Sequence, residues 1–377
     1  MQTKHNQNPD GFSSGFFYTF LKGTAYIYLI SAPKIIIIAY DIAINGGNFV
    51  KKFIYIILAI ALISGSITGC GSADRQSDSA PEADTISIVA TVFPAYDWMV
   101  NILGDNPAGA EVTLLAGNGT DLHSYQPTAE NIMKISTCDL FVYVGGESDK
   151  WVDDALKNAV NEDMTVISMM EVLADALKEE ELIEGMQEEK DSDEAADEPE
   201  YDEHVWLSLR NAAACVKSLS QAVQEIDKPN ASIYKANAEA YISQLEELNE
   251  RYEQAVEAGS RKVILFGDRF PFRYMAEDYG LDYYAAFAGC SAETEASFET
   301  ITFLSRKVDA LKLPVVLTIE GGDPRIAETI VKNTRTHNQQ ILTMDSLQTT
   351  TTADIEGGAT YLKSMENNLI VLKEALR

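Results

Sequence analysis

Two short segments of this chain place a histidine beside carboxylates and turn-forming residues. The first reads Gly-Asn-Gly-Thr-Asp-Leu-His-Ser over residues 117–124 and carries His123, and the second reads Asp-Glu-His-Val-Trp over residues 202–206 and carries His204. Imidazole nitrogens surrounded by carboxylate oxygens are typical ligands of a borderline divalent cation. A lone loop histidine is usually a plain surface residue, so the metal-site hypothesis rests on the pair. A further histidine, His337, ends a polar helical segment and is expected to be solvated.

The sequence around each histidine indicates how it is positioned. The apolar run at residues 112–115 predicts a buried strand that ends in a glycine-rich turn. A histidine just beyond the carboxyl end of a strand lies where open α/β sheets hold their ligands. Pro127 and Thr128 then open a helix. At the second site, Val-Trp-Leu at residues 205–207 is expected to hold His204 against the domain.

Several function classes are disfavoured. The sequence contains no Gly-x-Ser-x-Gly elbow, no phosphate-cradling loop and no His-Glu-x-x-His helix. A metallohydrolase would need an open coordination position and a general base, and no residue stands out as that base. The net charge of −29 disfavours nucleic acid and anionic lipid head groups, because both are polyanions. We therefore expect a binding protein rather than an enzyme.

Strand and helix patterns alternate through both halves of the chain beyond residue 84. Strands are predicted at 85–92, 111–115, 140–144 and 165–168 in the first half and at 262–266, 283–288, 314–319 and 340–343 in the second. Such alternation predicts mostly parallel sheets. Residues 230–258 repeat apolar side chains every three or four positions, which predicts one helix of roughly 40 Å. The expected fold is α/β, with two Rossmann-like lobes of mostly parallel sheet joined by one long rigid helix.

The first 84 residues carry a different pattern. Two lysines, an apolar run and the sequence Ile-Thr-Gly-Cys predict a signal peptide at 50–69, which resembles the bacterial lipoprotein signal with Cys70 as the lipidated residue. An uncleaved membrane anchor is the alternative, although the apolar run is shorter than the ~20 residues of a full span. We hypothesise that translation starts at Val50 and that residues 1–49 are a mis-called extension; a genuine membrane-associated segment is the alternative. Residues 70–84 predict a flexible tether.

The remaining boundaries divide the chain into an N-terminal lobe (85–229), a linking helix (230–258) and a C-terminal lobe (259–377). Within the first lobe, residues 178–203 hold 14 Asp or Glu and two Lys, which predicts a solvated, mobile loop. We interpret this loop as a solubilising insertion; the alternative is a weak cation collector beside the metal site. Cys138, Cys215 and Cys290 include no close pair, so neither a disulfide framework nor a Cys-x-x-Cys metal site is predicted.

Three motifs carry a family resemblance. They are Thr-Val-Phe-Pro-Ala-Tyr-Asp at 91–97, Asp-Leu-His-Ser-Tyr-Gln-Pro-Thr at 121–128 and His-Val-Trp-Leu-Ser at 204–208. Together they resemble the metal-binding lipoproteins of ABC importers for zinc and manganese, the cluster A-I substrate-binding proteins, over nearly all of residues 85–377. The resemblance implies two lobes joined by a long helix, with the metal in the cleft between them. It also implies that His123 and His204 are metal ligands.

The same resemblance implies two further ligands. The family's third ligand precedes a Tyr-Gly pair by about ten residues and falls here on Arg269, which cannot bind a cation. We predict that Asp268 replaces it through a local register shift; the alternative is that Arg269 pairs with a carboxylate and Glu320 supplies the ligand. Asp345 matches the fourth family ligand. Glu295 is interpreted as structural, capping the following helix.

The expected function is that of a lipid-anchored receptor on the outer face of the cytoplasmic membrane. It would capture a divalent transition metal and deliver it to a cognate ABC permease. Two histidines and two carboxylates leave the metal open, and the likeness to zinc-binding members favours Zn²⁺ over Mn²⁺. We expect a monomer whose partners are the metal ion, the permease and, through the lipid anchor, the membrane, with no nucleic acid. The alternative is a lipid-anchored adhesin that binds a host or matrix protein.

Overall fold

The structure is a computed structural model that describes residues 15–21, 24–31, 34–40, 85–187, 200–291 and 295–377. The strands β1 (Gly15–Leu21), β2 (Thr24–Ser31) and β3 (Lys34–Tyr40) form an antiparallel sheet in a unit separate from residues 85–377. The predicted start at Val50, signal peptide, lipidated Cys70 and tether lie outside the described residues. Among the described helices, none has the length and apolar character of a membrane span.

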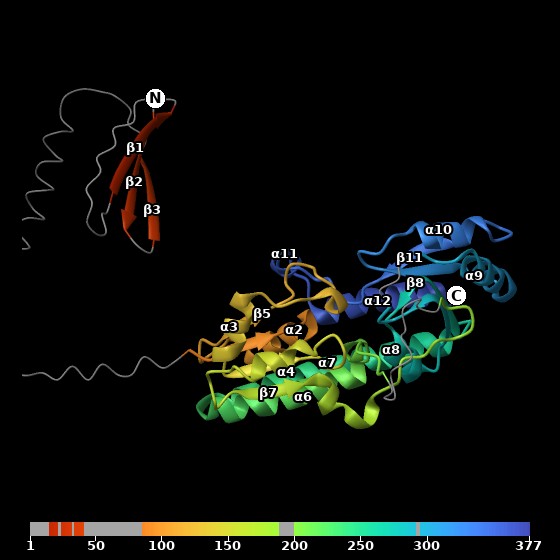
Figure 1. Ribbon diagram of the computed structural model, residues 1–377, viewed down its shortest axis with the longest axis horizontal. Helices are drawn as coiled ribbons and strands as arrows, with labels where there is room; N and C mark the ends of the chain where they lie inside the picture. Colours follow the sequence, from red (N-terminus) through yellow and green to blue (C-terminus); the bar gives the residue numbers. More distant parts are fainter. Residues whose placement is uncertain (1–14, 22–23, 32–33, 41–84, 188–199, 292–294) are drawn as a thin grey trace, which may run out of the picture. The chain divides into compact units, whose positions relative to one another are not determined.

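The first lobe, orange to green in Figure 1, is built on a four-stranded parallel sheet with the order β5-β4-β6-β7. Its strands are β4 (Ser87–Ala90), β5 (Glu111–Leu114), β6 (Leu140–Tyr143) and β7 (Thr165–Ser168). Its helices are α2 (Phe93–Leu103), α3 (Ala129–Thr137), α4 (Trp151–Leu156), α5 (Met169–Val172) and α6 (Leu209–Ile226). Because β4 lies between β5 and β6, the connections diverge there and a crevice forms at the carboxyl ends of these strands.

The second lobe repeats this plan with the order β11-β10-β8-β9, again all parallel. Its strands are β8 (Val263–Phe270), β9 (Asp282–Ala288), β10 (Val315–Ile319) and β11 (Gln340–Met344). Its helices are α8 (Arg273–Tyr279), α9 (Phe298–Leu311), α10 (Arg325–Lys332), α11 (Thr352–Glu356) and α12 (Tyr361–Ala375). Strand β8 runs four residues beyond the predicted 262–266, through a register shift between Phe266 and Arg269.

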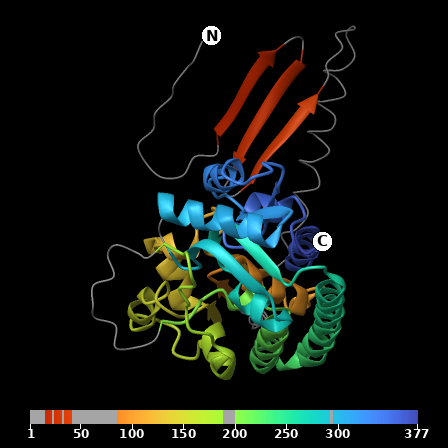
Figure 2. The ribbon, with the colours of Figure 1, turned by 90° about the vertical axis from the view of Figure 1, so that its right-hand side faces the viewer.

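The long helix α7 (Ala231–Ala258) connects the two lobes. Its buried side chains include the predicted apolar stripe, namely Tyr234, Ala238, Tyr241, Leu245, Leu248, Tyr252 and Val256. Helices α6 and α7, green in Figures 1 and 2, pack side by side along much of their length. Two parallel sheets with flanking helices and one long connecting helix confirm the predicted fold class.

The last helix, α12, packs on both lobes. The Tyr361 hydroxyl donates a hydrogen bond of 2.6 Å to the main-chain oxygen of Trp206, and its ring meets Trp98 of α2 edge-on at 5.2 Å. The Tyr252 hydroxyl of α7 donates to the main-chain oxygen of Met365 at 2.6 Å. One continuous apolar cluster includes core residues of both sheets. The sequence pattern placed this helix in the second lobe, but it also completes the core of the first.

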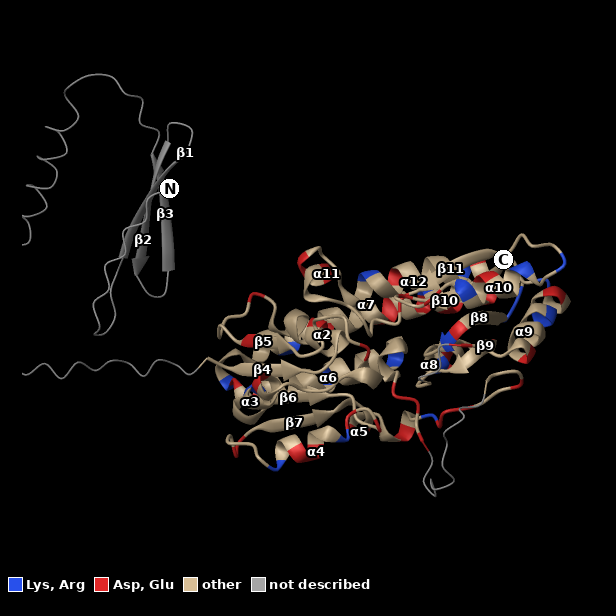
Figure 3. Ribbon diagram, turned by 45° about the horizontal axis from the view of Figure 1, so that its top comes forward, with Lys and Arg blue, Asp and Glu red and all other residues tan. Residues whose placement is uncertain are grey.

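The acidic segment is held along the second lobe over its described first part, residues 178–187. Glu181 pairs with Arg273 at 2.6 Å and Glu184 pairs with Lys307 at 3.1 Å. The main-chain N–H of Gln187 donates to the main-chain oxygen of Ala286 in β9. This part of the segment therefore contacts the second lobe, although the side chains of Glu181 and Glu184 are exposed, as predicted for a solvated loop. Figure 3 shows acidic residues on elements of both lobes, among them α4 and α10.

We predict that Tyr361→Phe lowers the free energy of unfolding by about 1–3 kcal/mol, because the buried Trp206 carbonyl loses its donor. Urea unfolding followed by tryptophan fluorescence measures the change. Tyr96→Phe is the control, since the half-buried Tyr96 hydroxyl makes no hydrogen bond among the described residues. An unfolding midpoint of Tyr361→Phe equal to that of the control would contradict this anchoring role for α12.

Candidate metal centre

His123 lies in a short turn that follows β5 at the carboxyl edge of the first sheet. The turn is the 3-10 helix η1 (Leu122–Ser124), and Leu122 anchors it in the core. The Asp121 carboxylate caps the turn by accepting the main-chain N–H of His123 at 3.0 Å. Thr128 caps α3 just beyond, where the sequence predicted a helix start. The local sequence thus fixes the backbone on both sides of the imidazole.

His204 is fully buried at the start of the 3-10 helix η3 (Val205–Leu207). One carboxylate oxygen of Asp202 accepts the main-chain N–H of His204 at 2.8 Å and lies 3.0 Å from its ring Nδ1. The indole N–H of Trp206 donates to the main-chain oxygen of Ser346 in the second lobe. Because Asp202 engages Nδ1, the Nε2 atom of His204 is left to face the cleft.

The two imidazoles meet through their Nε2 atoms, which lie 3.2 Å apart. The Nδ1 of His123 faces Ser148 Oγ at 2.8 Å and Glu203 Oε2 at 3.4 Å. Two nitrogens bound to one tetrahedral zinc ion lie about 3.3 Å apart. The two histidines singled out by their sequence context therefore converge at a spacing that suits one shared cation.

A glycine allows Glu203 to reach this place. Gly146, in the loop after β6, has a φ of +79°, and a Cβ atom there would lie 2.4 Å from Glu203 Oε1. The same oxygen accepts the main-chain N–H of Ser148 at 2.8 Å. The glycine pair after β6 thus provides the left-handed backbone and the space that bring a buried carboxylate beside His123.

The protonation of the histidine pair is set by burial and by nearby charge. Burial and the neighbouring His204 lower the pKa of His123 to about 3. For His204, burial opposes protonation, but Asp202 and Glu203 together outweigh it and raise the pKa above its usual value. Asp202 and Glu203 are themselves almost fully buried. Two buried carboxyl groups therefore lie around the converging nitrogens, an arrangement that suits a cation, although burial raises the pKa of Glu203.

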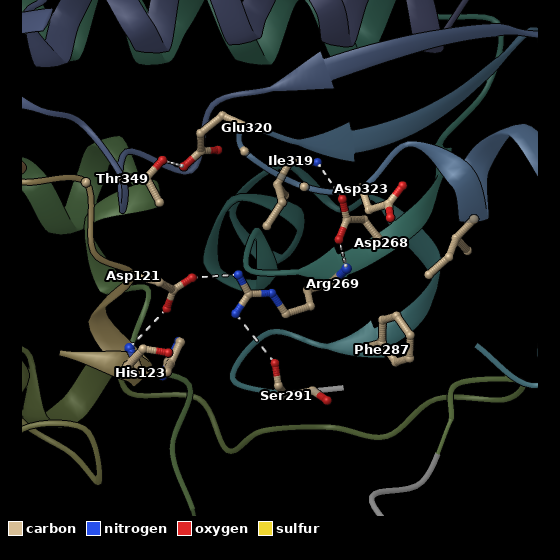
Figure 4. Close-up of a pocket in the computed structure, with 15 residues that line it drawn as sticks. Asp121, His123, Asp268, Arg269, Phe287, Ser291, Ile319, Glu320, Asp323 and Thr349 are labelled. Atoms are coloured by element: carbon tan, nitrogen blue, oxygen red, sulfur yellow. Dashed lines mark hydrogen bonds and ion pairs between the residues drawn. The ribbon is translucent and has the colours of Figure 1, made fainter. Parts of the chain in front are cut away.

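An ion pair crosses the cleft beside the histidines. The Arg269 guanidinium, from β8, donates to Asp121 at 2.6 Å, and Figure 4 shows it extending from the second lobe toward the Asp121 loop. This pairing matches one part of the sequence-based alternative, in which Arg269 binds a carboxylate. A cavity of about 510 Å³ next to it is lined by residues of both lobes, including His123 and Asp268.

The predicted carboxylate ligands have other partners. The two oxygens of Asp268 accept the main-chain N–H groups of Arg269 and Ile319. Asp345 accepts the N–H of Leu347, which holds a left-handed backbone with a φ of +62°. Glu320 accepts the N–H and the hydroxyl of Ser346, both at 2.6 Å. Burial and Asp345 raise the pKa of Glu320 to about 7.

A cysteine lies beside the histidine pair instead. Among the described residues, one cluster of at least three potential ligands has its atoms within 4.8 Å of one another, and it consists of His123, His204 and Cys290. Cys290 has no neighbouring cysteine in the sequence, so no cysteine metal site was predicted there. Its position in the sequence could have indicated a site residue, because Cys290 follows the predicted strand 283–288 just as His123 follows the strand 111–115.

Two other sequence-based expectations concern residues away from the pair. His337 is exposed, as expected for a solvated residue. Glu295 is exposed as well, but the cap of α9 is Ser297, whose hydroxyl accepts the main-chain N–H of Thr300 at 3.1 Å. The prediction that Glu295 caps this helix is wrong, because the helix begins three residues later at Phe298.

Known proteins resemble this chain in sequence and fold. The zinc-binding lipoprotein AdcA of Streptococcus pneumoniae is 29% identical over 321 residues, which cover 84% of this chain and 60% of AdcA. The high-affinity zinc uptake system protein ZnuA of Bacillus subtilis is 26% identical over 326 residues, which cover 86% of this chain and 97% of ZnuA. The crystal structure of the Zn(II)-bound ZnuA-like domain of S. pneumoniae AdcA superposes with a TM-score of 0.60 at 26% identity, over 78% of this chain and 99% of that domain.

The chain thus spans about 60% of the length of AdcA and nearly all of B. subtilis ZnuA. A family model described as the zinc-uptake complex component A, periplasmic (ZnuA), matches residues 88–375, which include both lobes, the linking helix and the two converging histidines. On this match and the shared two-lobe fold, the chain belongs to the ZnuA family of zinc-uptake components.

Proposed function

We propose that this protein captures a divalent transition metal ion, Zn²⁺ in preference to Mn²⁺, and delivers it to an ABC permease. The main support for this proposal is the pair of imidazoles from separate loops, whose Nε2 atoms lie 3.2 Å apart. The metal is the cargo of the protein and not a resident cofactor. The names of the relatives, zinc-binding lipoprotein and zinc uptake protein, support zinc as that cargo.

The electrostatics of the pocket support capture of a cation. Asp202 and Glu203 bring two buried carboxylates to the outer nitrogens of the imidazoles. These contacts orient the rings before any metal arrives, so little ordering entropy is lost on binding. The His204 side chain is fully buried, whereas that of His123 is 11% exposed. We infer that the ion enters from the His123 side.

The contact between the lobes supports a role in holding and releasing the cargo. The Arg269–Asp121 ion pair and the Trp206–Ser346 hydrogen bond both cross the cleft close to the histidines. Separating the lobes at the permease would break both contacts and expose the site. Release of the ion by such a separation would suit transport and would require no catalytic step.

The membrane anchor, the domain boundaries and the location of the protein are proposed from the sequence and the family. We propose a signal peptide at 50–69, a lipid anchor at Cys70, a tether at 70–84, and lobes at 85–229 and 259–377 around the linking helix 230–258. The protein would then act as a monomer on the outer face of the cytoplasmic membrane, with no nucleic-acid partner. Relatives named lipoproteins support this location. A preformed imidazole pair favours metal capture over the adhesin alternative, since adhesion requires no such pair.

We predict that replacing His123 and His204 together with Ala abolishes stoichiometric zinc binding, because both nitrogen ligands are removed. Metal analysis after equilibrium dialysis, together with isothermal titration calorimetry, measures the loss. His337→Ala is the matched control and should bind zinc as the wild type does, since His337 is exposed and lies outside the cluster. Wild-type zinc affinity in the double variant would refute the proposed site. Circular dichroism of each apo variant separates loss of the ligands from loss of the fold.

We predict that zinc affinity falls by at least about tenfold per pH unit once the pH drops below the pKa of His204. That pKa lies above the usual value because Asp202 and Glu203 together outweigh burial, so acidification places a proton on the nitrogen pair in competition with the metal. His123, with a pKa of about 3, stays neutral above pH 5 and adds no further proton. Competition with a chelator between pH 5 and pH 8 measures the dependence. An affinity that stays constant across this range would count against imidazole ligation.

A further inference from the structure

The second lobe brings a thiol close to the two imidazoles. The Cys290 sulfur and one nitrogen of each histidine ring lie within 4.8 Å of one another. In a tetrahedral site with two imidazoles and one thiolate, sulfur and nitrogen lie about 3.5 Å apart. A decrease of at most about 1.3 Å in the sulfur–nitrogen separations would therefore bring Cys290 into the coordination sphere of an ion held by His123 and His204.

The backbone around Cys290 holds the thiol at this place. Strand β9 ends at Ala288, so Gly289 and Cys290 lie at the carboxyl edge of the second sheet. A Cβ atom on Gly289 would lie 3.2 Å from His204 Nδ1 and 3.1 Å from Asp202 Oδ2, so a glycine here allows the two lobes to approach closely. The main-chain N–H of Cys290 donates to Glu180 Oε1 at 2.9 Å. The cysteine is thus positioned from both lobes.

Other side chains of the second lobe are less suited to serve as the ligand. Arg269 occupies the place of the third family ligand, but it is a cation and is paired with Asp121. Asp268 and Glu320 accept main-chain N–H groups in their own lobe. Neither carboxylate belongs to the cluster of ligand atoms around the two histidines.

We propose that Cys290 is the second-lobe ligand of the cargo ion and that its thiolate completes an N₂S set with His123 and His204. This inference rests on the proposed function of metal capture. As the metal–sulfur bond forms, the thiol proton passes to solvent, and neither the metal nor the sulfur changes oxidation state. A thiolate ligand selects zinc over manganese, because manganese prefers oxygen ligands. The same residue would also join the lobes through the ion, since His123 and His204 belong to the first lobe and Cys290 to the second.

Cobalt(II) tests this proposal, because a thiolate bound to cobalt produces a charge-transfer absorption band in the near ultraviolet. The purified full chain is titrated with cobalt(II), and we expect the band to saturate at one equivalent. In Cys290→Ser the band should vanish, and the zinc dissociation constant should rise at least about 100-fold, more than loss of an outer-sphere contact causes. The affinity for manganese should change far less. Cys138→Ala is the control, because Cys138 is buried in the first lobe and lies outside the cluster.

Cys290→His separates ligation from a packing role, because an imidazole restores a ligand without restoring a thiolate. We expect it to recover zinc binding while the charge-transfer band remains absent. If cobalt binds the wild type without this band and Cys290→Ser keeps wild-type zinc affinity, the Cys290 proposal is wrong and metal capture by the histidines stands. If the wild type binds neither zinc nor cobalt stoichiometrically, both proposals fail.

Discussion

The candidate metal site depends on the close approach of two imidazole nitrogens, the Nε2 atoms of His123 and His204, which lie 3.2 Å apart in a buried pocket. Burial, together with the neighbouring His204, lowers the pKa of His123 to about 3, so this ring resists protonation. Asp202 and Glu203 place buried carboxyl groups at the outer nitrogens. The result is a site suited to a divalent cation. In both turns an acidic side chain, Asp121 or Asp202, accepts the main-chain N–H of the histidine and so helps to hold the ring.

The two-lobe architecture brings the residues of the site together. Each four-stranded parallel sheet presents the carboxyl ends of its strands to a common cleft, so loops from opposite halves of the chain meet there. The helices α7 and α12 join the lobes through one shared apolar core. This core fixes the loops of one lobe relative to those of the other. Close to the site, the contacts between the lobes are polar, as in the Arg269–Asp121 pair. Such contacts can separate at a lower free-energy cost than an apolar core.

Features encoded in local sequence could be predicted, whereas features that depend on tertiary partners could not. The strands, α7 and the two histidine turns follow from periodicity, turn chemistry and recognisable motifs. The sequence could not show that Asp268 accepts the main-chain N–H of Ile319 or that Glu320 accepts that of Ser346, because tertiary packing brings these partners together. The docking of residues 178–187 was missed because the basic residues that bind them, Arg273 and Lys307, lie about one hundred positions away. Cys290 was missed because its partners in the cluster come from the other half of the chain.

Anomalous X-ray diffraction at the zinc edge, from zinc-loaded crystals of the protein, locates the bound ion and shows whether both imidazoles ligate it. We predict one dominant peak, about 2.0–2.1 Å from the Nε2 atoms of both His123 and His204. A dominant peak elsewhere in the cleft, such as between Asp268 and Glu320, with both imidazoles unligated, would contradict it.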